Sequence, residues 1–304
     1  MVLATLSHCS WNQAGRLTVL GLALTICSAL GVALDGPTGT ISFCLLLLIV
    51  GMPHGALDIE RLKTAELAGR SHLLQLLALY VGLAGAMLLV WQFSPVFAMA
   101  AFLMTSALHF SEDWKVVGEP FLSSGTAVAL LTAPTLLHAP QLRDIFIAVT
   151  GSPQAASLAD GMLLFAPVSL GLGAIAILTL WQRGWRAIAC VSAIVLIAMT
   201  LLPPIAAFAL FFCAYHSPLH LREVWSGLDG SRIRLLGITL LITSLALLIC
   251  AVLVMVEWRG ALSDSLVAAT FMTLSILTVP HMLAPPIARR WLKGSVRAAP
   301  TLSR

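Results

Sequence analysis

Long apolar runs separated by short polar turns dominate the chain. Eight of them approach or exceed the length of a membrane helix, which is about 20 residues with about 17 as the lower limit. A ninth stretch, 187–220, is too long for one straight crossing and contains Pro203 and Pro204. Two successive prolines remove two backbone donors and clash with the preceding turn, so we expect two shorter helices there. The eight clear runs are 17–34, 39–57, 72–92, 95–111, 121–138, 161–181, 233–256 and 264–284.

The composition excludes an ordinary soluble domain. Of the 304 residues, 59% are hydrophobic and 10% are charged, and the mean hydropathy is +0.98. Soluble domains carry about 25% charged residues, so most of this surface is expected to face lipid. The net charge is +4 without a long basic run, which gives no indication of nucleic-acid binding. We therefore expect an all-α, multi-pass protein of the cell (inner) membrane.

The basic residues predict the orientation of the spans. With the amino terminus inside, three turns that carry Lys and Arg fall on the cytoplasmic side, as the positive-inside bias requires. Two crossings within 187–220 bring the later basic segments to the same side, whereas one crossing would leave them outside. The basic turns are 58–71, 112–120 and 183–186, and the later basic segments are 222–234 and 285–304.

These arguments predict one integral-membrane domain over 1–304. It is expected to be a helical bundle of eight to ten spans, with an even number favoured and both termini in the cytoplasm. A short amino-terminal segment, 1–16, and a basic tail, 285–304, complete this domain.

Five of the eight histidines lie in four motifs at the carboxyl ends of apolar runs. In the expected topology these four runs all pass from outside to inside, so their histidines reach a similar depth near the cytoplasmic face. A single such histidine is usually a packing residue, but ionisable groups in a membrane are costly, and five at one depth favour a shared metal. His216 and His220 are spaced i, i+4, which places both rings on one helical face. The five are His54, His109, His216, His220 and His281.

Acidic residues follow three of these histidines at a distance of three or four positions. A metal-bound imidazole commonly gives its second N–H to a carboxylate, which fixes the ring and strengthens the ligand. The other interpretation is that these carboxylates are solvated charges at the membrane surface. The three candidates for support of the ligands are Asp58, Asp113 and Glu223.

The ligand type alone does not select the metal, because neutral imidazoles suit zinc, copper, iron and nickel. Zinc with four histidines would be closed and structural. A six-coordinate iron(II) with four histidines would keep two open positions for dioxygen and a substrate. A di-iron hydroxylase usually has more histidines in closely spaced boxes, so a single metal fits this chain better.

Four motifs resemble those of the Brp/Blh family of bacterial and archaeal β-carotene 15,15'-dioxygenases, over residues from about 50 to 284. The resemblance implies an integral-membrane enzyme that uses Fe(2+) and O2 to cleave the central double bond of β-carotene into two all-trans-retinal molecules. It also implies that His54, His109, His216 and His220 bind the iron, and that His281 lines the cavity or supports the ligands. The motifs are Pro53-His54-Gly55-Ala56 with Asp58, His109-Phe110 with Asp113, His216-Ser217 with His220, and Pro280-His281.

Aromatic residues near the motifs are candidates for contacts with a lipid-dissolved polyene. Tyr215, directly before His216, is the strongest candidate among them. Such residues also form ordinary core or interfacial belts, so both interpretations stay open.

Three other functions stay open at this point. An iron oxygenase with a different carotenoid or isoprenoid substrate would carry the same ligands. A transporter would spread polar residues through the depth of the membrane, and a non-catalytic carotenoid-binding protein would not require iron. The expected partners of the favoured enzyme are a carotenoid, O2 and membrane lipid, without nucleic acid.

Overall fold

The computed structural model describes residues 11–57, 60, 70–227 and 232–298, and within these ranges the chain is helical without strands. This confirms the expected all-α class. The elements of the first half are α2 (Trp11–Ala29), α3 (Pro37–Leu46), η1 (Leu47–Gly51), η2 (Met52–Gly55), α5 (Arg70–Phe93), α6 (Pro95–Ser111), η3 (Glu112–Val117), α7 (Pro120–Thr132) and α8 (Thr135–Thr150). Those of the second half are η4 (Pro153–Ala155), α9 (Ala156–Gln182), α10 (Arg186–Leu201), α11 (Pro204–Phe211), η5 (Phe212–His216), α12 (Ser217–Gly227), α13 (Arg232–Val256) and α14 (Leu262–Ala298).

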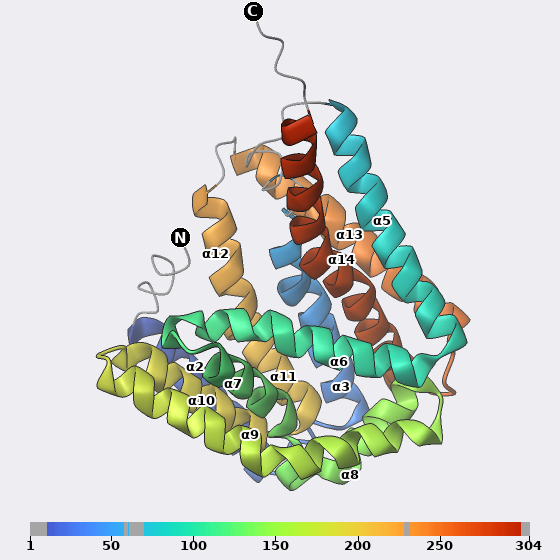
Figure 1. The fold of residues 1–304 in the computed structure, drawn as a ribbon. Helices are drawn as coiled ribbons and strands as arrows, with labels where there is room; N and C mark the ends of the chain where they lie inside the picture. Colours follow the sequence, from blue (N-terminus) through green and yellow to red (C-terminus); the bar gives the residue numbers. More distant parts are fainter. Residues whose placement is uncertain (1–10, 58–59, 61–69, 228–231, 299–304) are drawn as a thin grey trace, which may run out of the picture.

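The helices form two groups that meet at an angle (Figure 1). In one group, α14 packs between α5 and α13 and also against α3. In the other, α9 packs on α7 and α8, while α6 packs on α7 and α10 on α2. Helix α14 also contacts α6 and α8, so the last helix of the chain joins the two groups. The buried core therefore runs between segments that are far apart in the sequence.

The prolines break the apolar stretch 187–220 as predicted. Helix α10 ends at Leu201, Leu202 is extended, and α11 begins at Pro204. The adjacent proline pair cannot continue the hydrogen-bonding pattern of α10, but a proline fits the first turn of a new helix. The split of this stretch into two helices is confirmed.

The expected single run 121–138 is different in the structure. Helix α7 ends at Thr132, and α8 starts at Thr135 and leaves at a bend of 67°. Pro140 lies inside α8, and His138 just before it has a non-helical φ of −126°. Pro134 lies at the break itself, where its ring clashes with the carbonyl four residues earlier. The bend at Pro134 and the distortion at His138 explain why a single straight helix over 121–138 does not form.

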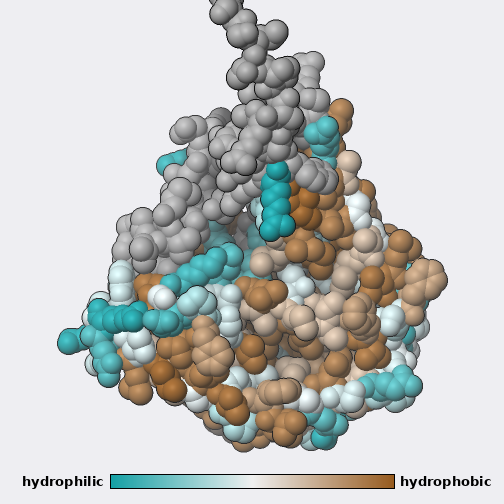
Figure 2. Space-filling view, in the orientation of Figure 1, coloured by the Kyte–Doolittle hydropathy of each residue, from teal (hydrophilic) through white to brown (hydrophobic). Residues whose placement is uncertain are grey.

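Five helices of the described part are long and apolar enough to cross a membrane, or six if the bent pair α7 and α8 forms one span. Two shorter apolar helical stretches, Pro37–Gly51 and Arg186–Leu201, fall below that length. Large apolar side chains lie exposed on the long helices, such as Phe93, Leu164 and Met255, and Figure 2 shows such residues over much of one face. A surface of this kind suggests a membrane protein, while the eight to ten spans and the side of the termini stay predictions.

The segment predicted as a basic tail starts inside a helix. Helix α14 continues to Ala298 although Pro285 and Pro286 lie within it. The last helix is therefore longer than the apolar run 264–284 from which it was predicted.

Candidate metal centre

Three separate segments bring histidines to one place. His109 lies near the end of α6, His216 ends η5 and is followed by His220 in α12, and His281 lies in α14. The ring centroid of His109 is 4.7 Å from that of His216 and 4.8 Å from that of His281. The rings of His216 and His220 are 4.5 Å apart. These four predicted site residues therefore form one cluster.

Asp113 is buried between two of these histidines. Its Oδ2 lies 2.9 Å from His216 Nδ1 and its Oδ1 lies 2.8 Å from His220 Nε2. The side chains of Asp113 and His216 are 0% exposed, and that of His220 is 16% exposed. A buried carboxylate needs such partners, and because an ionised carboxylate only accepts hydrogen bonds, both ring nitrogens donate to it. Asp113 was expected to support a ligand, and it contacts histidines from the other end of the chain.

The second nitrogen of His216 approaches His109. His216 Nε2 and His109 Nε2 are 3.0 Å apart. Two imidazole nitrogens bound to one metal at about 2.1 Å and at right angles would also lie about 3.0 Å apart. With its Nδ1 proton held by Asp113, a neutral His216 presents a lone pair at Nε2. The donor set therefore fits a metal between His109 and His216, with Asp113 behind.

A second combination of ligands is also compatible with these positions. Ligand atoms of Asp113, His216 and His220 all lie within 4.8 Å of one another. Two histidines and one carboxylate are a known ligand set of non-haem iron oxygenases. Both combinations share His216, which makes this residue the centre of the cluster.

The segment that carries Asp113 is fixed on the neighbouring helices. Trp114 is fully buried, and its Nε1 donates to Ser192 Oγ in α10 at 2.8 Å. Ser123 Oγ in α7 donates to the carbonyl oxygen of Trp114 at 2.9 Å. Gly118 ends this segment with a φ of +79°, a conformation that side chains rarely allow. The hydrogen bonds to α7 and α10 therefore fix the position of the segment that carries Asp113.

Two wide helical turns face one another beside the histidines. The π-helical segments η1 and η5 are in contact, and such turns occur frequently at functional sites. Across the contact, Cys213 Sγ donates to the carbonyl oxygen of Leu46 at 3.4 Å, and Ser217 Oγ donates to that of Val50 at 3.1 Å. These bonds give the carbonyls of Leu46 and Val50 additional partners and fix the segment around His216 relative to η1.

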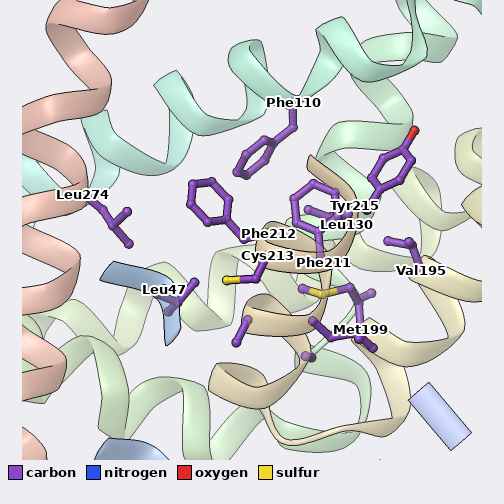
Figure 3. Close-up of a cluster of buried hydrophobic side chains, with 14 of the residues drawn as sticks. Leu47, Phe110, Leu130, Val195, Met199, Phe211, Phe212, Cys213, Tyr215 and Leu274 are labelled. Carbon is purple, nitrogen blue, oxygen red and sulfur yellow. The ribbon is translucent and has the colours of Figure 1, made fainter. Parts of the chain in front are cut away.

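Aromatic rings enclose His216. The ring of Phe212 stacks on that of His216 at 5.3 Å, and Phe110 meets it edge-on at 4.9 Å. Phe211 lies at 5.7 Å from His216 and at 5.0 Å from Phe110. Figure 3 shows Phe110 from α6 directed towards Phe212, with Phe211 beside it. This apolar shell keeps bulk water away from the buried side of the histidine.

Gly51 gives a direct test of this packing. A Cβ atom at Gly51 would lie 2.5 Å from the ring of Phe212, so the alanine side chain would press that ring against His216. We expect Gly51→Ala to lower the free energy of unfolding by about 1–3 kcal/mol, as other overpacked cores do. Thermal unfolding of the detergent-solubilised protein measures the loss.

The matched control is Gly82→Ala in α5. Nothing lies within 4 Å of a Cβ atom at this position, and alanine is the better helix former. We expect equal or higher stability for this variant. Equal melting temperatures for Gly51→Ala and the unmodified protein would contradict the close contact.

The structure tests the other predicted site residues only in part. His54 lies in η2, which packs against α12, but its side chain and that of Glu223 are outside the described part, as is all of Asp58. Tyr215 is buried, with its ring 6.2 Å from Trp114 and 6.0 Å from Phe211. Its contacts are those of a core residue, and its role towards a substrate stays a prediction.

Two known relatives and one family model all point to the same family of proteins. The chain is 26% identical over 257 residues to the Beta-carotene 15,15'-dioxygenase of Uncultured marine bacterium 66A03, which covers 80% of this chain and 92% of that protein. It is also 26% identical over 211 residues to the Probable beta-carotene 15,15'-dioxygenase Blh of Halobacterium salinarum, with 60% of this chain and 61% of that protein covered. No solved structure matches the chain significantly. Residues 45–285, which include the whole histidine cluster, match the family described as Beta-carotene 15,15'-dioxygenase, and the chain belongs to this family.

Proposed function

We propose that this protein is an iron(II)-dependent dioxygenase of the cell membrane that cleaves the central double bond of β-carotene to give two all-trans-retinal molecules. The observation that carries the proposal is the approach of His216 to His109, with Asp113 hydrogen-bonded to the far nitrogen of His216. That arrangement is typical of a metal-bound histidine supported by a carboxylate. Membership of the β-carotene dioxygenase family supports the substrate and the reaction.

The proposed ligands are His54, His109, His216 and His220. Iron(II) held by them would supply the binding and activation of dioxygen. Asp113 keeps a proton on His216 Nδ1 and on His220 Nε2, so that each ring offers its other nitrogen to the metal. His281, whose ring lies 4.8 Å from that of His109, would shape the cavity beside the ligands.

The protein contributes position and an apolar environment to this reaction. The substrate is a hydrocarbon that dissolves in lipid, so an enzyme embedded in one membrane domain over 1–304 needs no aqueous route for it. The aromatic rings around His216 exclude water from the buried side of the site. Exclusion of water limits side reactions of the activated oxygen.

Expression in a β-carotene-producing bacterium tests the proposed reaction. We expect the orange colour to fade and retinal to accumulate, because the substrate and the enzyme share the membrane. Extraction and chromatography of the carotenoids measure both. Retained colour in cells whose purified protein contains iron would contradict β-carotene as the substrate and favour another isoprenoid lipid.

A further inference from the structure

An apolar cavity lies between α6, α8, α9, α11 and α14. We infer that this cavity binds one ring-bearing end of the carotenoid, and that its depth sets which double bond reaches the histidines. The inference rests on the proposed function, because it assumes a carotenoid substrate. It adds to the proposed function where the substrate binds and what determines which double bond is cleaved.

The cavity and the histidine cluster share one face of α6. Ser106, Phe102 and Met99 line the cavity and lie three, seven and ten residues before His109. These spacings follow a single helical face. At 1.5 Å per residue, the far end at Met99 is about 15 Å from the position of His109 along the helix.

Two other segments repeat this relation. Phe208 lines the cavity eight residues before His216, and Phe271 lines it ten residues before His281. The corresponding distances along a helix are about 12 and 15 Å. On three elements the cavity therefore begins about one helical turn from the cluster, at Ser106, and extends to about 12–15 Å from it, a distance comparable with half of an extended carotenoid.

A row of aromatic rings connects the cavity with the cluster. Phe208 stacks on Phe212 at 5.4 Å, and Phe212 stacks on His216 at 5.3 Å. Phe208 is also 5.9 Å from Phe271 across the cavity wall. A conjugated chain packs favourably along such rings, so we expect the polyene to follow this row from the cavity to the histidines.

The lining fits a hydrocarbon ring. Ser106 is the one residue of the lining with a polar side chain, and all others are apolar. A polar ligand would lose its hydration here without enough partners, whereas the end of a carotene has no hydrogen-bonding group to satisfy.

Broken helices create the space. Pro134, at the bend between α7 and α8, and Pro204, at the start of α11, both line the cavity. The far wall is formed by Met162 of α9 and Leu142 of α8, two helices that lie below α6 in Figure 1.

Filling the far end tests the inference. We expect Met162→Trp to lower kcat/KM for β-carotene at least about tenfold, because the indole would occupy the space that the carotenoid ring needs. The remaining product should shift from retinal to two aldehydes of unequal length, since the ring can no longer enter fully. The assay uses purified full-length protein in detergent, with chromatography of the products and iron content as a measure of an intact site.

A matched control lies two residues away on the same helix. Leu164 is 76% exposed on the outer side of α9, so Leu164→Trp should leave rate and products within about twofold. If Met162→Trp loses its iron, the smaller change Leu142→Phe replaces it, with Leu137→Phe as its exposed control on α8.

The outcomes separate the inference from the proposed function. An unmodified rate with retinal as the sole product in the iron-containing cavity variant would overturn the inference and leave the dioxygenase intact. If the unmodified protein neither cleaves β-carotene nor retains it during purification without oxygen, the proposed function fails and the inference falls with it.

Discussion

Replacing His216 by alanine is expected to remove bound iron from the protein and to abolish carotenoid cleavage. His216 is 0% exposed and belongs to both ligand combinations that the cluster permits. Its loss also leaves Asp113 with one of its two histidine partners, and a buried carboxylate is costly without full compensation. Iron per protein by elemental analysis and retinal by chromatography measure the two losses.

His138→Ala is the matched control for this prediction. His138 bonds Gln141 at 2.7 Å inside α8 and is not part of the cluster. We expect iron content and activity to stay within about twofold of the unmodified protein. Full iron content in His216→Ala would contradict the proposed metal centre.

His109→Ala then distinguishes the two ligand combinations. If the four histidines hold the metal, this variant loses its iron because the nitrogen 3.0 Å from His216 Nε2 is gone. If Asp113, His216 and His220 hold it instead, the variant retains iron. We expect the loss.

Asp113→Asn is expected to lower iron affinity or activity by about 10–100-fold, the usual cost of removing a carboxylate behind a metal-bound histidine. The carboxylate accepts a hydrogen bond at each oxygen. An asparagine keeps one accepting oxygen and presents an NH2 donor at the other position. One of the two histidine N–H groups then faces a donor, and that ring turns or changes its protonated nitrogen. Iron titration of the metal-free protein measures the affinity.

Glu112→Gln is a control beside it in the sequence. Glu112 lies at the surface and pairs with Lys115 at 2.7 Å. Exposed pairs of this kind contribute about 0–1 kcal/mol, so we expect unchanged iron affinity. Equal effects of the two variants would show that Asp113 acts through general charge and not through its two hydrogen bonds.

The sequence predicts part of this architecture well. Hydropathy places most helices, and the proline pair at 203 and 204 predicts the break that the structure contains. The common depth of the histidines predicts their convergence, and His109, His216, His220 and His281 do lie together. These features follow from local rules, namely helix length, proline chemistry and the direction of each span.

Other features depend on contacts that spacing along the chain does not reveal. Asp113 was associated with His109 because it follows it by four residues, whereas its partners come from η5 and α12. The π-helical turns are maintained by side chains from opposite segments, such as Ser217 on the carbonyl of Val50. The cavity results from bends in the helices, and the single run 121–138 was predicted across Pro134, where the bend after Thr132 lies.

The position of His281 in the last helix has a consequence for biogenesis. Ribosomes release the chain from its amino terminus onwards, so α6 is synthesised long before α14 exists. The ring of His281 reaches that of His109 only once the final segment has docked. We therefore expect nascent chains that end before α14 to lack a complete histidine cluster.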